Sequence, residues 1–369
     1  MWQRVVLASV LATASASAQE TADVPAQAAP DRGDDILVGV SYFAGWWEAQ
    51  PNKWTRRDGS DWRPDFPERI PVLGQYNAQD VMNREIVAAA EYGVDFFMIL
   101  WYPKPGGEHP EPNAANLERG LLDFMASPEA HRMKFMVEFC NHRPYNVRTD
   151  EDWEACIEVF LKAFAHPSHL RIDGKIPIKV HSSWDFYRDA DEDVEVCRAR
   201  IERLREAARD AGLGELLVGV GVGGQGAIGP DNWVVGMFDW TGTYMDLPQL
   251  EQREEDYPYE ELTGFARTGR LMHAQGPLPY VPYLPSGWNP RPWSDPRASF
   301  ALPTRAQWTA TLEELRQDLI AQPNLGFPGR PAFTIYAWNE FGEGGMVAPT
   351  AGEQYMKLEA IRDVFKPQR

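Results

Sequence analysis

Short apolar runs alternate with longer amphipathic stretches along almost the whole chain, and this alternation limits the folds open to it. We expect strands at 36–42, 94–101, 134–139, 176–181, 216–222, 234–240, 279–284 and 332–338. We expect helices at 80–92, 117–125, 152–164, 194–211, 257–270, 306–321 and 353–365. The apolar runs lack the in–out alternation of a half-exposed sheet, so the strands should pair in parallel and be covered on both faces.

Eight parallel strands can close into a barrel or form an open, doubly wound sheet. Polar and aromatic residues at the strand ends distinguish the two, namely Tyr42, Trp101, Glu138, His181, Trp240, Tyr283 and Glu340. An open sheet binds its ligand mainly at one switch point, whereas a barrel gathers all strand ends around one mouth. The sequence therefore predicts an α/β fold with a single (β/α)8 TIM-type barrel over residues 36–369 and long loops at its mouth.

The first 35 residues do not fit this pattern. Residues 1–18 combine an n-region containing Arg4, a short apolar stretch and Ala16-Ser17-Ala18, which resembles a signal-peptide cleavage site. A membrane anchor is the alternative, but the apolar stretch is far shorter than the roughly 20 residues that span a bilayer. Residues 19–35 are expected to form a disordered linker. We therefore expect an exported protein, periplasmic or secreted, without a membrane span.

The chain is strongly acidic, with a formal net charge of −18. Such a charge argues against nucleic acids and anionic membranes as partners. The 14 Trp and 13 Tyr residues suit the apolar faces of sugar rings, although aromatic residues also build cores. No HExxH, calcium-loop or clustered-histidine pattern occurs, so we expect no metal and no other cofactor. An oligo- or polysaccharide is the expected partner, and a monomer the expected state.

The three cysteines, Cys140, Cys156 and Cys197, match no zinc-binding spacing. A disulfide between Cys140 and Cys156 is conceivable in an exported protein. Buried free thiols are the simpler expectation for an odd number of cysteines.

The sharpest chemical signal is the segment Tyr336-Ala337-Trp338-Asn339-Glu340-Phe341-Gly342-Glu343-Gly344-Gly345, followed by Pro349. An apolar strand leads directly into two carboxylates, Glu340 and Glu343, and glycines allow a tight turn. Acids after a strand also cap helices, which is the alternative interpretation. Aromatic neighbours favour a semi-apolar site in which one acid stays protonated while the other ionises, and cleavage of a glycosidic bond requires that division.

This segment resembles the signature of glycoside hydrolase family 99 and its family 99-like relatives, which include endo-α-mannanases and endo-α-mannosidases. The similarity extends to Tyr42, to the strand segments around 95–102 and Glu138, and to 175–177. Family members usually carry Trp and His between the two acids, where this chain has Phe341 and Gly342. This difference bears on whether mannan is the substrate more than on the reaction mechanism.

The resemblance implies a (β/α)8 barrel and a retaining mechanism that uses the substrate's own 2-hydroxyl. Glu340 would act as the base on that hydroxyl, which attacks the anomeric carbon and forms a 1,2-anhydro sugar. Glu343 would protonate the leaving oxygen and then activate water to open the epoxide. α-Mannosides and α-rhamnosides have the required 2-hydroxyl anti to the leaving group.

Ten further residues are expected around the substrate: Tyr42, Trp46, Trp101, Glu138, His142, His181, Trp240, Tyr283, Trp338 and Asn339. For two of them a structural role is equally open, because Glu138 can pair with Arg143 and His181 can be a packed histidine. Lys104, His109 and Arg291 are expected to be solvated loop charges rather than ligands of an acidic sugar. The glycine-rich stretch 219–229 lacks the Lys-Ser/Thr of a phosphate loop, so a close-packed or mobile loop is expected.

The predicted function is an exported glycoside hydrolase that cleaves α-linked, mannoside- or rhamnoside-like glycans with retention. A glycosyltransferase of surface-polysaccharide assembly is one alternative, because many family 99-like sequences are described in this way. Export argues against it, since nucleotide-sugar donors are cytoplasmic. A non-catalytic carbohydrate-binding barrel is the other alternative, and the presence of both Glu340 and Glu343 argues against that.

Overall fold

A computed structural model of the protein describes residues 36–224, 226 and 228–367. The signal peptide predicted at 1–18 and the linker predicted at 19–35 lie outside the described residues. The folded part lies within one compact unit.

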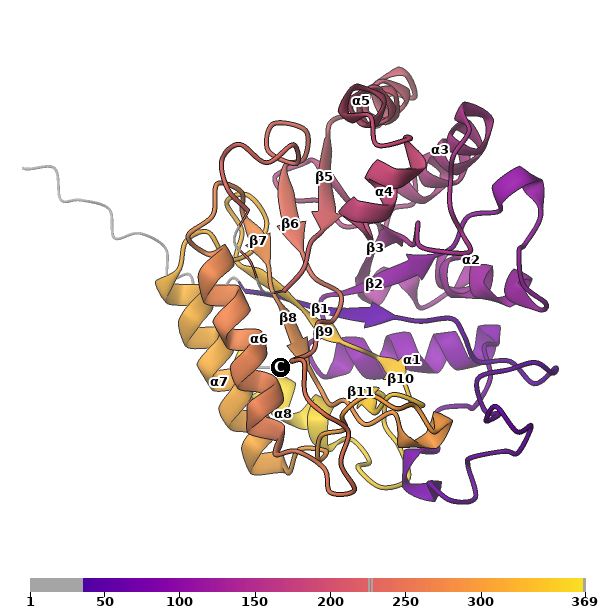
Figure 1. Ribbon diagram of the computed structural model, residues 1–369, viewed down its shortest axis with the longest axis vertical. Coiled ribbons are helices and arrows are strands. Elements are labelled where there is room, and N and C mark those ends of the chain that lie inside the picture. The colour runs from indigo at the N-terminus through magenta and orange to yellow at the C-terminus, as the bar shows by residue number, and fades with distance from the viewer. Residues whose placement is uncertain (1–35, 225, 227, 368–369) are drawn as a thin grey trace, which may run out of the picture. The chain divides into compact units, whose positions relative to one another are not determined.

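Nine parallel strand segments form the sheet, and they close it into a barrel (Figure 1). They are β1 (Leu37–Tyr42), β2 (Phe96–Trp101), β3 (Lys134–Phe139), β4 (Ile176–Val180), β5 (Leu216–Gly221), β6 (Trp240–Gly242), β7 (Tyr280–Val281), β8 (Tyr283–Pro285) and β9 (Ala332–Tyr336). The order is β7-β6-β5-β4-β3-β2-β1-β9-β8, and only Pro282 separates β7 from β8. The two ends of the sheet are thus one chain segment, interrupted where proline has no N–H to donate. The predicted (β/α)8 barrel is confirmed.

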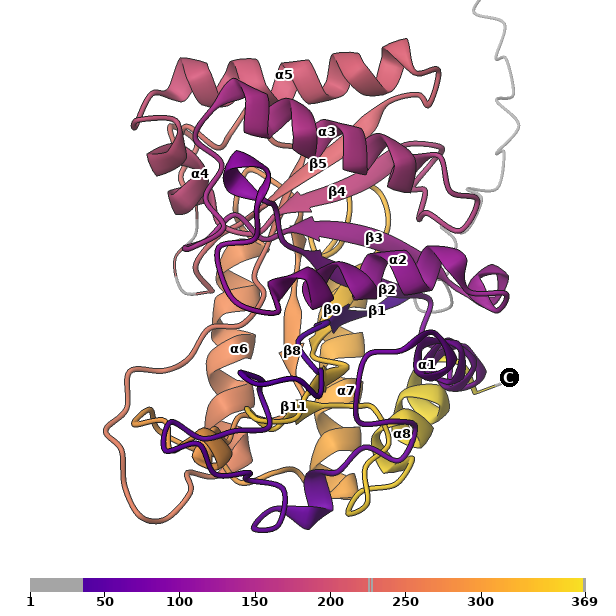
Figure 2. The ribbon, with the colours of Figure 1, turned by 90° about the vertical axis from the view of Figure 1, so that its right-hand side faces the viewer.

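Helices surround the barrel on its outside (Figures 1 and 2). They are α1 (Gln79–Glu91), α2 (Arg119–Ala126), α3 (Asp150–Phe164), α4 (Ser183–Asp189), α5 (Val194–Asp210), α6 (Tyr259–His273), α7 (Arg305–Ala321) and α8 (Met356–Phe365). All seven predicted helices are present, with ends shifted by a few residues. The short helix α4 was not predicted, and it follows β4 almost directly at the carboxyl end of that strand.

The strand predicted at 234–240 is wrong for most of its length, because β6 begins only at Trp240. Residues before it form tight turns, in which the Phe238 N–H donates to the Val234 carbonyl at 3.1 Å. Val234 and Met237 are nevertheless buried. Their apolar character therefore reflects packing of a loop against the core rather than a strand.

The core has two parts, one inside the barrel and one between the strands and the helices. The inner part includes Phe96, Met98, Met136, Leu217, Trp240 and Phe327. The outer part is larger and holds most apolar side chains of the helices. Cys140, Cys156 and Cys197 are all buried and free, as predicted. Within the described ranges, every helix is too short or too polar to cross a membrane.

Candidate active site

The two acids of the predicted motif lie on a short hairpin just beyond the carboxyl end of β9. Strand β10 (Asn339–Glu340) pairs antiparallel with β11 (Gly345–Met346), and Glu343 lies in the turn between them. Gly344 has φ +77°, a conformation that glycine adopts without strain. A Cβ on Gly345 would lie 2.3 Å from the Tyr336 ring, so this glycine makes room for Tyr336 beside the turn.

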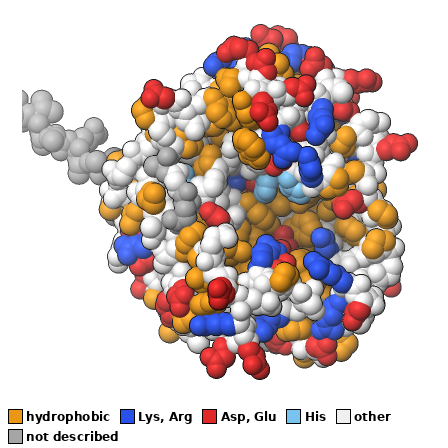
Figure 3. All heavy atoms as spheres, in the orientation of Figure 1, with side chains coloured by type: hydrophobic (Ala, Val, Ile, Leu, Met, Phe, Trp, Pro, Cys, Tyr) orange, Lys and Arg blue, Asp and Glu red, His pale blue; other side chains and the backbone are white. Residues whose placement is uncertain are grey.

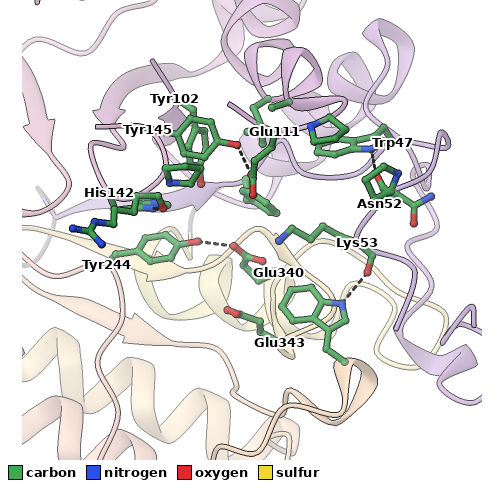
Figure 4. A pocket seen from close by; sticks show the side chains of 18 residues that line it. Trp47, Asn52, Lys53, Tyr102, Glu111, His142, Tyr145, Tyr244, Glu340 and Glu343 are labelled. Carbon is green, nitrogen blue, oxygen red and sulfur yellow. Dashed lines mark hydrogen bonds between the residues drawn. The ribbon is translucent and has the colours of Figure 1, made fainter. Parts of the chain in front are cut away.

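Both carboxylates line a cavity of about 500 Å³ at the barrel mouth (Figure 4). Figure 3 shows this face hollowed near its centre, with hydrophobic and histidine side chains inside and basic side chains at the rim. Its other main lining residues are Phe43, Trp47, Asn52, Lys53, Tyr102, Glu111, His142, Arg143, Tyr145, Tyr244 and Trp293. Aromatic walls with a few converging polar groups are typical of a site for a polar organic ligand.

Each catalytic candidate is held by its own tyrosine. The Tyr244 hydroxyl donates to Glu340 Oε1 at 2.8 Å, and the Tyr336 hydroxyl donates to Glu343 Oε2. The Lys53 side chain points toward Glu340 (Figure 4), and Arg297 Nη2 lies 3.7 Å from Glu343 Oε1. The carboxylates are thus oriented before any ligand arrives.

Burial raises the pKa of both acids. The pKa of Glu340 rises to about 8 because the carboxyl is buried and because Glu343 lies near it, against the opposing effects of Tyr244 and Lys53. Burial also raises the pKa of Glu343, and Arg297 opposes that rise. The two groups titrate together, so near neutral pH the pair holds a proton. Burial and mutual repulsion thus favour a state in which one of the two carboxyl groups keeps its proton while the other is ionised.

A loop rich in tryptophan supports the motif from behind. Trp46 lies 4.3 Å from Trp54 and 5.1 Å from Phe341 between ring centroids, and its Nε1 donates to the Asn339 carbonyl at 2.7 Å. Trp62 packs against Trp54 at 5.1 Å. Trp46 is therefore a buried support and not a substrate contact, because the other indoles of the loop enclose it.

Three more predicted contacts hold the motif in place instead of lining the cavity. The Asn339 side chain accepts from the Phe43 N–H at 2.9 Å and donates to the Phe43 carbonyl at 2.8 Å. Trp338 Nε1 and the Tyr42 hydroxyl donate to the two oxygens of Glu85, at 3.0 and 2.8 Å. Burial raises the pKa of this Glu85 carboxyl on α1 to about 7. These contacts fix the motif to β1 and to α1, and they correct the expectation for Tyr42, Trp338 and Asn339.

Glu138 lies fully buried inside the barrel, below the cavity. Its Oε1 is 2.8 Å from Lys179 Nζ and 2.8 Å from His181 Nδ1. Burial acts to raise the pKa of Glu138, but Lys179 and the hydrogen-bonded His181 outweigh burial and hold it at about 2. The structural interpretation of Glu138 is therefore the correct one, with Lys179 in place of the expected Arg143. His181 reaches a smaller recess beside the main cavity, 5.4 Å from the Tyr244 ring.

Trp101, Trp240 and Tyr283 do not line the cavity either. Trp101 packs against Phe160 of α3 at 5.3 Å, outside the barrel. Trp240 begins β6 and packs at 4.9 Å against Phe327 of the inner core, toward the amino end of the barrel. The Tyr283 hydroxyl donates to the Asp246 carbonyl at 3.1 Å, within the protein.

Of the ten predicted contacts, His142 is the one that lines the main cavity together with Glu340 and Glu343. The loop charges Lys104 and His109 face Glu118 at 2.5 and 3.6 Å, and Arg291 pairs with Asp256 at 2.8 Å. None of the three lines the main cavity, but each faces an acidic side chain instead of being a solvated loop charge as predicted. The glycine-rich stretch begins close-packed, since a Cβ on Gly221 would lie 1.6 Å from the His181 carbonyl oxygen.

The glycine between the two acids makes room for an aromatic residue from a distant loop. Trp293 lines the cavity beside Glu343, and a Cβ on Gly342 would lie 2.2 Å from its indole. Trp293 Nε1 also donates to the Lys53 carbonyl at 2.8 Å. Gly342 thus lets Trp293 form part of the cavity wall and hold the segment that carries Lys53.

We predict that Gly342→Ala lowers kcat/KM about 10- to 100-fold, because the indole must leave its place in the wall and reacting groups shift with it. The assay is the glycan cleavage that we propose below. Gly264→Ala is the matched control, since a Cβ there meets nothing within 4 Å. Adding Trp293→Ala should remove the clash but not restore activity, and full activity of Gly342→Ala alone would contradict the assigned packing.

Within residues 36–224, 226 and 228–367, no group of three His, Cys, Asp or Glu side chains is placed to hold a metal ion.

Comparison of the sequence with family models and with curated proteins finds no match. Among solved structures, a "glycoside hydrolase-like protein" is similar with a TM-score of 0.60 and 16% identity, over 91% of this chain and 95% of that one. A GH99 endo-α-mannosidase from Bacteroides thetaiotaomicron is similar in two structures, with TM-scores of 0.54 and 0.55 and identities of 13% and 12%. They cover 90% and 89% of this chain and 98% of each enzyme chain.

The chain has the barrel fold of these proteins. The family 99 resemblance indicated by the motif is thus accompanied by structural similarity over 90% and 89% of this chain. Identities of this size establish the fold alone.

Proposed function

We propose that the protein is an exported glycoside hydrolase that cleaves α-linked glycans of the mannoside or rhamnoside kind with retention of configuration. The observation that carries the proposal is the pair Glu340 and Glu343, which line one cavity and are held by separate tyrosines. A glycosidase needs one carboxyl group that donates a proton and one ionised carboxylate that acts as a base or as a nucleophile. The aromatic walls of the cavity suit the apolar faces of sugar rings.

The proposed route uses the 2-hydroxyl of the substrate as the nucleophile. Glu340 takes the proton of that hydroxyl while its oxygen bonds to the anomeric carbon, and Glu343 gives a proton to the departing glycosidic oxygen. Glu343 then takes a proton from water, which opens the 1,2-anhydro ring, and Glu340 returns its proton to the 2-oxygen. The first step starts with Glu340 ionised and Glu343 protonated. A 2-hydroxyl bound at Glu340 and a glycosidic oxygen at Glu343 favour that distribution.

Four measurements on purified protein test this proposal. A product screen on α-mannans, rhamnose-containing polysaccharides and acidic glycans should show cleavage of an α-linked substrate. NMR of the first product should show retention, because two inversions at one carbon cancel. The matching 2-deoxy substrate should bind without being cleaved, and a 2-fluoro sugar should label neither acid. Covalent labelling of Glu340 would point to an ordinary two-carboxylate route, and inversion would exclude both routes.

A further inference from the structure

A second recess of about 300 Å³ adjoins the main cavity. His142 and Tyr244 line both, so the two spaces share a wall at the carboxyl ends of the strands. Helix α4 forms the outer side of the recess, through Ser183, Trp184 and Asp185. A glycan held over Glu340 can therefore continue into this recess without leaving the mouth of the barrel.

Trp184 stands at the edge of this recess with 59% of its surface exposed. Every other large hydrophobic residue of comparable exposure within the described part of the chain is aliphatic. Its ring lies 6.1 Å from Tyr187, which in turn stacks on Trp233 at 5.6 Å with an interplanar angle of 29°. An indole left open to water but braced from behind is a suitable platform for the apolar face of a sugar ring.

The platform is also fixed to the barrel through the start of α4. Ser182 caps the helix by accepting from the Asp185 N–H at 3.1 Å. Asn141, which follows β3, donates to the Ser182 carbonyl at 2.9 Å and accepts from the Ser182 N–H at 3.0 Å. These contacts fix the backbone at the start of α4, which carries Trp184, relative to the strand ends that carry the active site, so the backbone loses little conformational freedom when a ring stacks on the indole.

The polar groups of the recess indicate the kind of ring that it accepts. The side chains of Ser183 and Asp185 line it and make no hydrogen bond or ion pair with any described residue. A hydroxyl and a carboxylate can bind adjacent hydroxyl groups of a sugar, whereas the carboxylate would repel a uronate or a sulfate. A neutral, hydroxyl-rich ring therefore fits better than an acidic one.

We propose that this recess is a second subsite, which binds a neutral sugar unit of the same glycan stacked on Trp184 and hydrogen-bonded to Asp185. The proposal rests on the function proposed above and deepens it. The substrate is a chain that extends beyond the units at the cleaved bond. The enzyme accordingly prefers oligosaccharides that are long enough to fill both cavities.

The test measures binding by calorimetry in a Glu343→Gln background, so that turnover does not obscure it. The probes are neutral α-linked manno- and rhamno-oligosaccharides of two and four units, alongside acidic oligosaccharides of the same lengths. Trp184→Ala should weaken binding of the best neutral tetrasaccharide about tenfold, and the loss should be larger for the tetrasaccharide than for the disaccharide. Asp185→Ala should weaken the same tetrasaccharide, and Leu122→Ala, which removes another exposed side chain, should leave affinity unchanged.

The outcomes separate this proposal from the one on which it rests. Equal affinity of the tetrasaccharide for Trp184→Ala and its parent would overturn the subsite, as would failure of every neutral tetrasaccharide to bind. Binding that depends on Trp184, together with no hydrolysis of any α-linked glycan by the wild-type protein, would support the subsite and refute the hydrolase. A thermal melt of each variant controls for misfolding.

Discussion

Replacing Glu343 by Gln should lower kcat by about 10²- to 10⁴-fold, the usual contribution of a positioned acid or base. Glutamine keeps the shape of the side chain and its contact with Tyr336, but it can neither give a proton to the leaving oxygen nor take one from water. Glu340→Gln should lower kcat by a similar factor, because it leaves the 2-hydroxyl of the substrate without a base. Both variants should fold, since each removes a group whose charged form is disfavoured by burial.

Two further results distinguish a catalytic pair from two independent acids. The Glu340→Gln/Glu343→Gln variant should be little slower than either single variant, because groups that act as a unit are not additive. The wild-type rate should show a bell-shaped dependence on pH, because activity needs one protonated and one ionised member of the pair. Loss of turnover in Glu343→Gln with unchanged sugar binding would mark an enzyme, whereas full turnover in that variant would show that Glu343 is not the proton donor and would refute the proposed mechanism.

The barrel itself was predictable because each strand is buried on both faces. The run Phe96–Trp101, for example, is apolar throughout. A parallel strand that is covered on both faces needs apolar residues at every position, whereas a half-exposed strand does not. The prediction failed at 234–240, where an apolar segment packs as a loop and the strand begins at its last residue. An apolar run indicates that a segment is buried, but it does not show whether that segment is a loop or a strand.

The predicted cavity residues were often wrong by one position along the strand. Tyr42 and Trp101 face the helix layer, whereas Phe43 and Tyr102, which directly follow them, line the cavity. Successive side chains of a strand point to opposite faces, so an error of one residue moves a side chain from the mouth to the core. Glu340 and Glu343 were found because the glycine-rich turn itself identifies the end of the strand.

Other cavity residues lie in loops and are brought in by contacts between distant segments. Trp293 reaches the site because Gly342 leaves space for it, 49 positions later in the chain. Tyr244 comes from the loop after β6, whose strand was placed too early. The sequence contains each of these residues, but only the folded barrel shows which of its many aromatic residues meet.

The buried charges inside the barrel lead to the largest stability effect that we expect. Lys179→Met should lower the free energy of unfolding by about 3–5 kcal/mol, the usual cost of removing one partner of a buried ion pair. Lys179 Nζ lies 2.8 Å from Glu138 Oε1, and the side chains are 1% and 0% exposed. Glu138 Oε2 has no hydrogen-bond partner among the described residues, so the carboxylate depends on Lys179 and His181 at its other oxygen.

The pH dependence of this loss follows from the pKa of Glu138. In the wild-type protein its folded pKa of about 2 lies below the unfolded value of roughly 4.3, so its contribution is present above pH ~4.3 and is lost as the pH falls toward 2. Without Lys179 the balance reverses, because burial then outweighs the remaining partner and raises the pKa of Glu138. Protonation removes the buried charge in the variant, so the difference in stability should be smaller at pH 5 than at pH 8.

Urea unfolding followed by tryptophan fluorescence at the two pH values measures both effects. Lys179→Met/Glu138→Gln should recover much of the lost stability at pH 8, since no unpaired carboxylate is then left in the barrel. Arg203→Met is a suitable control, because Arg203 and Glu154 form an exposed pair whose loss should cost at most about 1 kcal/mol. If Lys179→Met were as stable as the control at pH 8, the Glu138 carboxylate would not depend on this lysine, and its low pKa would need another source of positive charge.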